Sequence, residues 1–343
     1  MYALARNLLF KLDAERAHEL TLDVFRRLPL LSTAPFRCVD QPAPVKLMGL
    51  EFRNLVGLAA GLDKNGECLR AWDALGFGFV EVGTVTPRPQ PGNPRPRMFR
   101  LPEHQALINR LGFNNKGVDH LLQQVARARY RGVLGINIGK NFDTPIERAA
   151  DDYLHCLRKV YTAASYITVN ISSPNTKNLR ELQDESNLRG LLMAIDGERK
   201  ALADQHGLRR PIVVKIAPDV TDEQIDIIAS VTRECGMDGL IATNTTISRS
   251  GVEADPLAGE SGGLSGRPLR PLAEAVMRRL RSCVGAGFPL IGVGGIVSGA
   301  DALARRNAGA DLLQIYSGFI YRGPALIREC VQATTGSPAG SSA

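Results

Sequence analysis

The sequence lacks the cysteine and histidine patterns that bind metals or form disulfide frameworks. Its six cysteines are scattered over 343 residues, with no CxxC pair and no Cys/His spacing of the zinc-binding kind. Isolated cysteines of this sort indicate a reducing compartment and give no sign of a structural zinc site. We therefore predict no metal centre and no cross-links.

Long apolar runs are also missing. No run approaches the ~18 residues that a membrane-spanning helix needs, and the N-terminus lacks an unbroken signal-peptide core followed by a small-residue cleavage site. We therefore expect a cytoplasmic protein. The formal net charge of +7 suits an anionic partner, but charge alone does not choose among nucleic acid, a lipid surface and small anions.

Acidic and histidine side chains are scarce at the ends of the short apolar runs that begin at Leu55 and predict strands. Asp63 is the lone acid at a predicted strand end, and the five histidines lie on predicted helices or loops. This scarcity disfavours metal-dependent hydrolysis and histidine-based acid–base catalysis.

The N-terminus contains two short amphipathic segments with basic flanks. Apolar residues recur at helical spacing over 4–12 and again over 17–28, with arginines and a lysine between them. Asp13 can cap the second helix, Pro29 is expected to end it, and a Pro-rich linker follows over 35–44. Two interpretations stay open: a packed hairpin, or an interfacial device whose apolar stripe contacts lipid while its arginines contact head groups.

From Leu55 onward, short apolar runs alternate with helix-like segments. The eight predicted strands are Val56–Ala60, Phe79–Val82, Val133–Ile138, Tyr166–Ile171, Ile212–Ile216, Gly239–Ala242, Leu290–Val293 and Leu312–Ile315. This alternation predicts an α/β fold with a parallel sheet closed as a (β/α)8 TIM barrel, and an open doubly wound sheet is the alternative. We assign 1–45 to the helical hairpin and linker, 46–335 to the barrel, and 336–343 to a disordered tail.

The stretch from Asn170 to Thr176 (NISSPNT) follows an apolar, β-branched run and crowds polar, uncharged side chains together. Pro174 keeps it off helical geometry. Such residues dominate turns, so a simple turn is one interpretation. The other is a site that holds a small planar polar molecule and moves one proton in a dry setting.

Lys64 and Lys215 each end an apolar run, where an ammonium group is costly unless it meets an anion or polar ligand. Glycines at 292–295 and the Tyr-Ser-Gly at 316–318 follow the last two strands, where barrels of this type hold a phosphate on loop amides. Schiff-base chemistry is the rival use of a barrel lysine, but the surrounding asparagines and the phosphate signal favour cofactor binding.

Three connections exceed ordinary loop length and are therefore expected to be functional or disordered. They span 86–115, 174–187 and 248–267. The second is a natural lid, because it follows the polar stretch at Asn170. The third is rich in glycine and is expected to lie over a ligand or against phosphate.

Several of these segments resemble the dihydroorotate dehydrogenases, specifically the class 2, membrane-associated, quinone-reducing type. The resemblance covers residues 1 to about 333. The matching motifs are 57–64 (GLAAGLDK), 83–93 (GTVTPRPQPGN), 109–115 (NRLGFNN), 135–140 (GINIGK), 170–175 (NISSPN), 214–218 (VKIAP), 242–246 (ATNTT), 262–266 (GGLSG), and 292–295 (GVGG) with 314–319 (QIYSGF).

The resemblance implies one FMN per chain and a set of ligand-contacting residues. The implied FMN contacts are Ala60, Gly61, Leu62, Asp63, Lys64, Thr84, Asn137, Asn170, Lys215 and Thr243, with the phosphate on Gly266, Gly295, Tyr316 and Ser317. The implied dihydroorotate contacts are Lys64, Asn109, Arg110, Leu111, Gly112, Phe113, Asn170, Asn175, Asn244 and Thr245.

By the same resemblance Ser173 is the catalytic base, where class 1 enzymes use a cysteine. Because serine is a poor base, it needs a relay and a closed lid, for which Thr176 and Phe113 are the candidates. The implied reaction oxidises dihydroorotate to orotate in de novo pyrimidine synthesis.

The implied acceptor is a membrane quinone, and the N-terminal helices would bind anionic lipid peripherally at the cytoplasmic face of the cell membrane. We expect a monomer or weak oligomer and no nucleic acid. The rivals are a dihydrouridine synthase acting on RNA and a non-enzymatic flavin carrier at the membrane surface.

Overall fold

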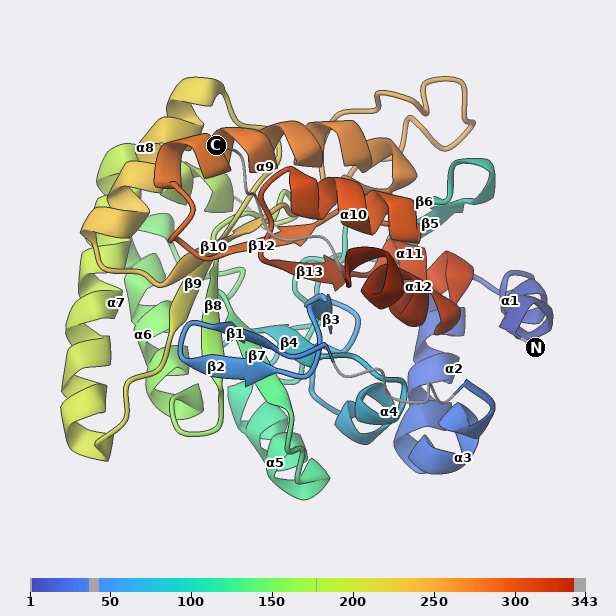
Figure 1. Cartoon of the computed structure of the whole chain (residues 1–343), viewed down its shortest axis with the longest axis horizontal. Coiled ribbons are helices and arrows are strands. Elements are labelled where there is room, and N and C mark those ends of the chain that lie inside the picture. Colours follow the sequence, from blue (N-terminus) through green and yellow to red (C-terminus); the bar gives the residue numbers. More distant parts are fainter. Residues whose placement is uncertain (1, 37–42, 177, 336–343) are drawn as a thin grey trace.

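The computed structural model describes residues 2–36, 43–176 and 178–335, and its centre is a closed barrel of eight parallel strands (Figure 1). The strands are β3 (Val56–Leu58), β4 (Phe79–Val85), β7 (Val133–Ile138), β8 (Tyr166–Asn170), β9 (Ile212–Ile216), β10 (Gly239–Ala242), β12 (Leu290–Val293) and β13 (Leu312–Ile315). Pairing of β13 with β3, with Leu313 opposite Val56, closes the ring. The predicted (β/α)8 barrel is confirmed, and the predicted strands agree with these except for a few terminal residues.

Helices surround the barrel because its strands are buried on both faces and need cover on the outside. They are α4 (Leu69–Ala74), α5 (Val118–Ala128), α6 (Ala149–Val160), α7 (Glu185–His206), α8 (Asp222–Glu234), α9 (Arg270–Val284), α10 (Gly299–Asn307), α11 (Ser317–Arg322) and α12 (Ala325–Thr334). Short 3₁₀ turns occur at η2 (Pro102–His104), η3 (Ile146–Arg148), η4 (Leu179–Gln183) and η5 (Arg267–Leu269). Most strand residues are fully buried, so the barrel interior is a packed core rather than a pore.

Two small antiparallel sheets were not predicted from the sequence. One is the hairpin of β1 (Val45–Leu47) and β2 (Leu50–Phe52). The other joins β5 (Met98–Leu101), β6 (Ala106–Asn109) and β11 (Gly263–Gly266). The long connections 86–115 and 248–267 are therefore partly ordered by pairing with each other, as the opposition of Gly263 and Asn109 shows.

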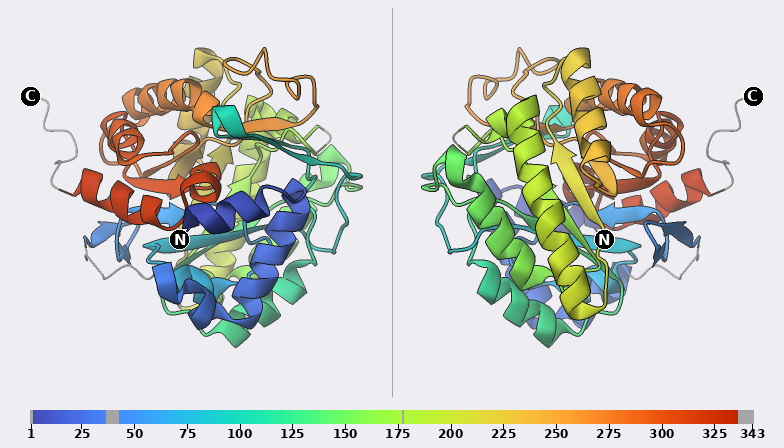
Figure 2. Two further views of the ribbon diagram at one scale, coloured as in Figure 1. Left: turned by 90° about the vertical axis from the view of Figure 1, so that its right-hand side faces the viewer. Right: turned by 90° about the vertical axis from the view of Figure 1, so that its left-hand side faces the viewer.

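The N-terminal segment forms α1 (Tyr2–Leu9), α2 (Ala14–Arg27), α3 (Pro29–Thr33) and the 3₁₀ turn η1 (Ala34–Phe36), which lie together against one side of the barrel (Figure 2). Asp13 caps α2, as predicted, because its Oδ1 accepts hydrogen bonds from the backbone N–H groups of Glu15 and Arg16, both at 3.0 Å. Pro29 follows the end of α2 but also begins α3, since proline is tolerated in a first helical turn. The 336–343 tail and most of the predicted linker lie outside the described residues.

The helices of this segment are tied to the 86–115 connection by a buried ion pair. Glu15 on α2 meets the Arg97 guanidinium at 2.7 Å, and both side chains are more than nine-tenths buried. Tyr2 donates a hydrogen bond of 2.6 Å to the carbonyl of Ile320 on α11. The hairpin is therefore packed on the barrel, and it still leaves apolar side chains outside: Leu4 is 71% exposed, Leu8 66% and Leu31 69%.

Candidate active site

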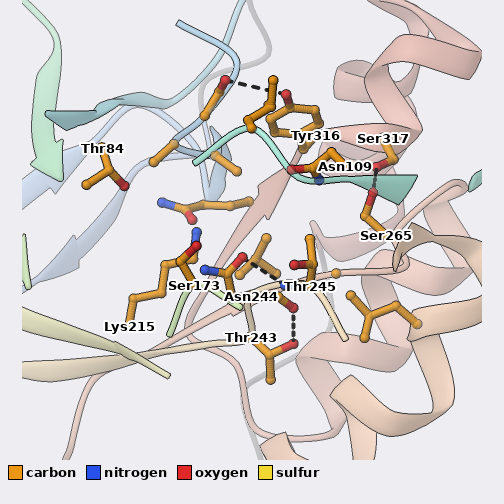
Figure 3. A pocket seen from close by; sticks show the side chains of 18 of the residues that line it. Thr84, Asn109, Ser173, Lys215, Thr243, Asn244, Thr245, Ser265, Tyr316 and Ser317 are labelled. Atoms are coloured by element: carbon orange, nitrogen blue, oxygen red, sulfur yellow. Dashed lines mark hydrogen bonds between the residues drawn. The ribbon is translucent and has the colours of Figure 1, made fainter. Parts of the chain in front are cut away.

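A cavity opens at the carboxyl ends of the barrel strands, where barrel sites are built (Figure 3). Most of the predicted site residues line it. They are Ala60, Gly61, Lys64, Thr84, Asn109, Leu111, Gly112, Phe113, Asn170, Ser173, Asn175, Lys215, Thr243, Asn244, Thr245, Gly266, Gly295, Tyr316 and Ser317. The structure thus brings together in one cavity residues that lie far apart in the sequence.

Five of the predicted residues do not line this cavity: Leu62, Asp63, Arg110, Asn137 and Thr176. The Asp63 carboxylate instead accepts hydrogen bonds at the start of α4, including one of 3.0 Å from the Trp72 indole N–H. The Arg110 side chain turns to Glu260, at 2.6 Å. Asn137 lies behind Thr84, whose hydroxyl donates to it at 2.5 Å.

Ser173 lies at the cavity wall, in the loop that follows β8, and is almost fully buried. Its Oγ accepts a hydrogen bond of 3.2 Å from the backbone N–H of Asn175. The Asn175 side chain in turn donates to the carbonyl oxygen of Asn109 at 3.1 Å, which joins the motif to the end of β6. The Thr176 hydroxyl is buried and makes no hydrogen bond within the described part of the chain.

Both predicted lysines reach the cavity. Lys64 Nζ donates to the carbonyl of Gly61 at 3.0 Å, and burial lowers the pKa of Lys64 to about 8. Lys215 at the end of β9 makes no hydrogen bond through its ammonium group to any described residue. Burial lowers the pKa of Lys215, and the carboxylate of Glu81 opposes this shift. A buried ammonium without a protein partner is a strong attachment point for a polar or anionic ligand.

The opposite end of the cavity is lined by glycine loops after β12 and β13. Gly295 has φ +77°, and a Cβ there would lie 2.4 Å from Arg270 Cα, so only glycine fits. The Ser317 hydroxyl donates to Ser265 Oγ at 2.8 Å. In Figure 3 this end, marked by Tyr316, Ser265 and Ser317, lies away from Lys215 and Ser173.

Sequence reasoning missed several polar residues of this region. Ser265 and Gln314 line the cavity. Both belong to the matching motifs 262–266 and 314–319, so their place in those motifs could have identified them as site residues. Ser172 lies just behind it: its hydroxyl donates to Asn170 Oδ1 at 2.7 Å and accepts from Asn244 Nδ2 at 2.9 Å.

A second, apolar cavity lies between the N-terminal helices and the barrel. It is lined by Tyr2, Arg6, Leu9, Phe10, Ala14, Ala17, His18, Thr21, Leu22, Phe25, Phe36, Leu62, Trp72, Met98, Arg100, Leu107, Phe319, Ile320 and Pro324. Leu62 reaches this cavity while its neighbour Gly61 lines the first. Burial, with a smaller effect of the Lys64 charge, lowers the pKa of His18 to about 3, so the imidazole is neutral near pH 7. The amphipathic spacing pointed to these helices, but no local signal singled out His18.

The closed barrel and the polar cavity at its strand ends define a (β/α)8-barrel enzyme. The family model for dihydroorotate dehydrogenase matches residues 43–334. The chain belongs to the dihydroorotate dehydrogenase family, as the resemblance in the sequence had indicated.

Relatives of the quinone-dependent class match this chain over nearly their whole length. A protein of Burkholderia pseudomallei (strain 1106a) named dihydroorotate dehydrogenase (quinone) is 59% identical over 337 residues, covering 97% of this chain and 98% of the relative. One of the same name from Paraburkholderia phymatum is 60% identical over 336 residues, covering 97% of each.

Solved structures give the same picture. The DHODH of Eimeria tenella in complex with ferulenol superposes with a TM-score of 0.88 at 39% identity, covering 94% of this chain and 90% of that one. The ligand-free form from the same organism gives 0.84 at 41% identity, covering 92% and 93%. In the described part of the chain, no helix is both long and apolar enough to cross a membrane.

Proposed function

We propose that this chain oxidises dihydroorotate to orotate, with FMN as cofactor and a membrane quinone as electron acceptor, in pyrimidine synthesis. The observation that carries the proposal is the single cavity in which Ser173, two lysines and four asparagines meet glycine loops at the far end. These groups suit a dry, polar site for a planar polar ring beside a phosphate-bearing cofactor.

The residues present fit FMN. Lys215 offers a buried ammonium without a hydrogen-bonding partner among the described residues, and Gly295 allows a close backbone approach. When bound, FMN supplies the acceptor for a hydride from the substrate and passes electrons to the quinone. Lys215 would lie near the electron-rich part of the ring, and Gly266, Gly295 and Ser317 would hold the phosphate.

Dihydroorotate carries a carboxylate and a ring of alternating carbonyl and N–H groups. Amide side chains both donate and accept, so Asn109, Asn175 and Asn244 match such a ring, and the Lys64 ammonium would meet negative charge. The Asn175 amide donates to the backbone carbonyl of Asn109 at 3.1 Å and to the Asn109 Oδ1 at 3.4 Å, which holds both amides before the substrate arrives.

Ser173 would remove the proton from the substrate carbon beside the ring carbonyl. A serine hydroxyl is a weak base, so the proton must pass on through a further acceptor. The buried Thr176 hydroxyl, three residues along the chain from Ser173, makes no hydrogen bond to any described residue and is a candidate for such a relay. Phe113, which is nearly buried and lines the cavity, would help to exclude water.

The apolar cavity under the N-terminal helices would receive the quinone. Its walls are largely aliphatic and aromatic, and the exposed leucines of α1 and α3 would lie in a lipid surface beside arginines that meet anionic head groups. We accordingly propose a peripheral position at the cytoplasmic face of the membrane.

Anaerobic addition of dihydroorotate to the purified protein tests this proposal. We expect the flavin absorbance to bleach within seconds and to recover when a quinone is added. Bleaching without recovery would contradict the quinone step. If dihydroorotate bleaches nothing, the non-enzymatic flavin carrier becomes the favoured function. If NADPH bleaches the flavin and uridine-containing RNA restores its absorbance, a dihydrouridine synthase is favoured.

A further inference from the structure

A buried carboxylate, Glu81 on β4, lies inside the barrel below the cavity and is fully inaccessible to solvent. It accepts three hydrogen bonds. Asn137 Nδ2 donates to its Oε1 at 2.8 Å, while the Tyr166 hydroxyl at 2.9 Å and Gln314 Nε2 at 2.7 Å donate to its Oε2. Because Gln314 also lines the cavity, the carboxylate lies one side chain away from the ligand space.

A continuous chain of hydrogen bonds leads from Glu81 to the other side of the cavity. Thr84 Oγ1 donates to Asn137 Oδ1 at 2.5 Å, and Asn170 Nδ2 donates to Thr84 Oγ1 at 2.8 Å. Beyond Asn170, the chain continues through Ser172 to Asn244, by the two bonds of 2.7 and 2.9 Å described above.

Every donor in this chain points toward Glu81. The hydroxyls and amides along it both donate and accept, so their orientation is not fixed by their own chemistry. An ionised carboxylate only accepts, and it therefore fixes the direction at one end. With that end fixed, the amides of Asn170 and Asn244 each keep a second N–H that is not used by the chain.

We propose that Glu81 is a positioning residue that sets the hydrogen-bonding direction of the cavity. It would make Asn170 and Asn244 present N–H groups, which bind the carbonyl oxygens of the flavin and of the pyrimidine ring. The proposal rests on the proposed function for the identity of those ligands.

Two titratable groups respond to the Glu81 charge. Burial, aided by Glu81, raises the pKa of Tyr166 well above its usual range, so Tyr166 stays protonated and remains a donor. On β9, Glu81 favours the ammonium form of Lys215 against the effect of burial. The Glu81 carboxylate thus supports the donor direction along the chain of hydrogen bonds. It also favours the ammonium form of Lys215, which would meet the flavin.

Replacing Glu81 with glutamine would reverse this arrangement. The new amide group brings a fourth donor into a site that already holds three. If that donor faces Asn137, then Asn137 must turn its carbonyl toward position 81, and Thr84, Asn170, Ser172 and Asn244 must each reverse in turn. The final amide would then lose the hydrogen bond of 2.8 Å that Asn244 Oδ1 accepts from the backbone N–H of Thr245.

The first test is Glu81→Gln in the full-length protein, with Thr168→Val as the control. Thr168 is equally buried in the barrel, and its hydroxyl makes no hydrogen bond to any described residue. For Glu81→Gln we expect the Kd for FMN and the KM for dihydroorotate each to rise about 10-fold or more, the effect of losing about one charged hydrogen bond. Thr168→Val is expected to change neither constant by more than about 2-fold.

The pH dependence separates positioning from simple support of the fold. Without Glu81, Lys215 loses its proton at a lower pH, so the decline of FMN affinity on the alkaline side should begin at lower pH in Glu81→Gln. Glu81→Asp keeps the charge and should keep the wild-type pH profile. Wild-type constants and an unshifted profile in Glu81→Gln would refute the proposal.

Ser172→Ala provides a test that leaves Glu81 in place. This change breaks the chain between Asn170 and Asn244, so we expect a KM increase for dihydroorotate with FMN affinity unchanged, and an unaltered KM would count against the chain even if Glu81→Gln failed to fold. Failure of the proposed function is distinguishable, because wild-type protein would then show no flavin bleaching with dihydroorotate.

Discussion

At the residue scale, the chemistry depends on how burial changes the charge and the hydrogen bonding of a few side chains. Lys64 and Lys215 lie in the same cavity, but they are held differently: Lys64 has a carbonyl partner, whereas Lys215 has no hydrogen-bonding partner among the described residues. Ser173 is held by the neighbouring Asn175 N–H rather than by a histidine or carboxylate. The cavity therefore offers polar and charged groups to a ligand, but it places no histidine or carboxylate next to Ser173.

Removing the Ser173 hydroxyl tests its role as the base. We expect Ser173→Ala to slow flavin reduction by dihydroorotate by about 10²-fold or more, the lower range of general-base contributions. Stopped-flow absorbance in a single turnover measures this rate directly. FMN content serves as the control and should match the wild type. An unchanged rate would remove Ser173 from the mechanism.

The lowered pKa of Lys64 leads us to expect that substrate binding depends on pH. Its pKa in the free protein is about 8, so its ammonium is largely charged at pH 7 and largely neutral at pH 9. An anionic substrate binds the charged form, so the KM for dihydroorotate should rise above pH 8, approaching roughly tenfold per pH unit. Steady-state assays from pH 6.5 to 9.5 measure this change.

Lys64→Arg is the matched variant for that experiment, because a guanidinium keeps its charge throughout this range. Its KM should be nearly independent of pH, even if the absolute value is higher. A wild-type KM that stays flat to pH 9.5 would show that Lys64 does not meet the substrate charge.

At the element scale, the barrel strands were predictable and the small sheets were not. Ile212–Ile216 is apolar on both faces apart from Lys215, and such a run identifies a buried parallel strand without further information. By contrast, β11 consists of Gly-Leu-Ser-Gly and pairs with β6, far away in the sequence. No local pattern encodes that pairing, so this segment was expected to be a loop.

The same limit applied to side-chain direction within the site. Asn137 and Asn170 both stand at or near strand ends, but only Asn170 lines the cavity. Arg110 belongs to a recognised motif, yet its partner Glu260 lies in a distant loop. The sequence identified the positions that form the site, whereas strand register and long-range partners decide which side chains face inward.

The link between α2 and the barrel predicts a stability effect. Glu15→Gln would leave the Arg97 guanidinium buried without its anion, although Arg97 still donates to the carbonyls of Pro91 and Asn93. Breaking a buried pair on one side typically costs about 3–5 kcal/mol. We therefore expect a clear shift of the urea unfolding midpoint to lower concentration.

The control is the pair of Arg158 and Glu198 on neighbouring helices, in which the arginine is about half exposed. Glu198→Gln should cost at most about 1 kcal/mol, because exposed ion pairs contribute little. Equal midpoints for the two variants would show that the Glu15 pair does not hold the N-terminal helices in place.

At the scale of the whole molecule, apolar exposure is concentrated on one flank. Of the twelve exposed large apolar side chains among the residues that the structure describes, eight belong to the N-terminal segment between Leu4 and Leu31. Figure 2 shows these helices together on one side of the barrel. A patch of this kind on a protein with net charge +7 is suited to an anionic lipid surface.

Vesicle binding tests this arrangement. A Leu4→Gln/Leu8→Gln variant should lose most of its binding to vesicles that contain anionic lipid, as measured by cosedimentation, because two exposed leucines no longer enter the lipid. Met193→Gln on α7 is the control, since Met193 is 62% exposed but lies on the barrel. Both variants should reduce flavin with dihydroorotate at the wild-type rate. Equal vesicle binding by the two variants would contradict the proposed orientation.

Gly61 and Leu62 are adjacent in the chain, but they line different cavities, one polar and one apolar. A single turn of backbone thus acts as a partition between two compartments. In kinetic terms, a molecule bound in the apolar cavity, beside Leu62, need not displace a molecule bound in the polar cavity, beside Gly61. An inhibitor of the apolar compartment should therefore lower the maximal rate without being overcome by more dihydroorotate, so the two sides can be targeted independently.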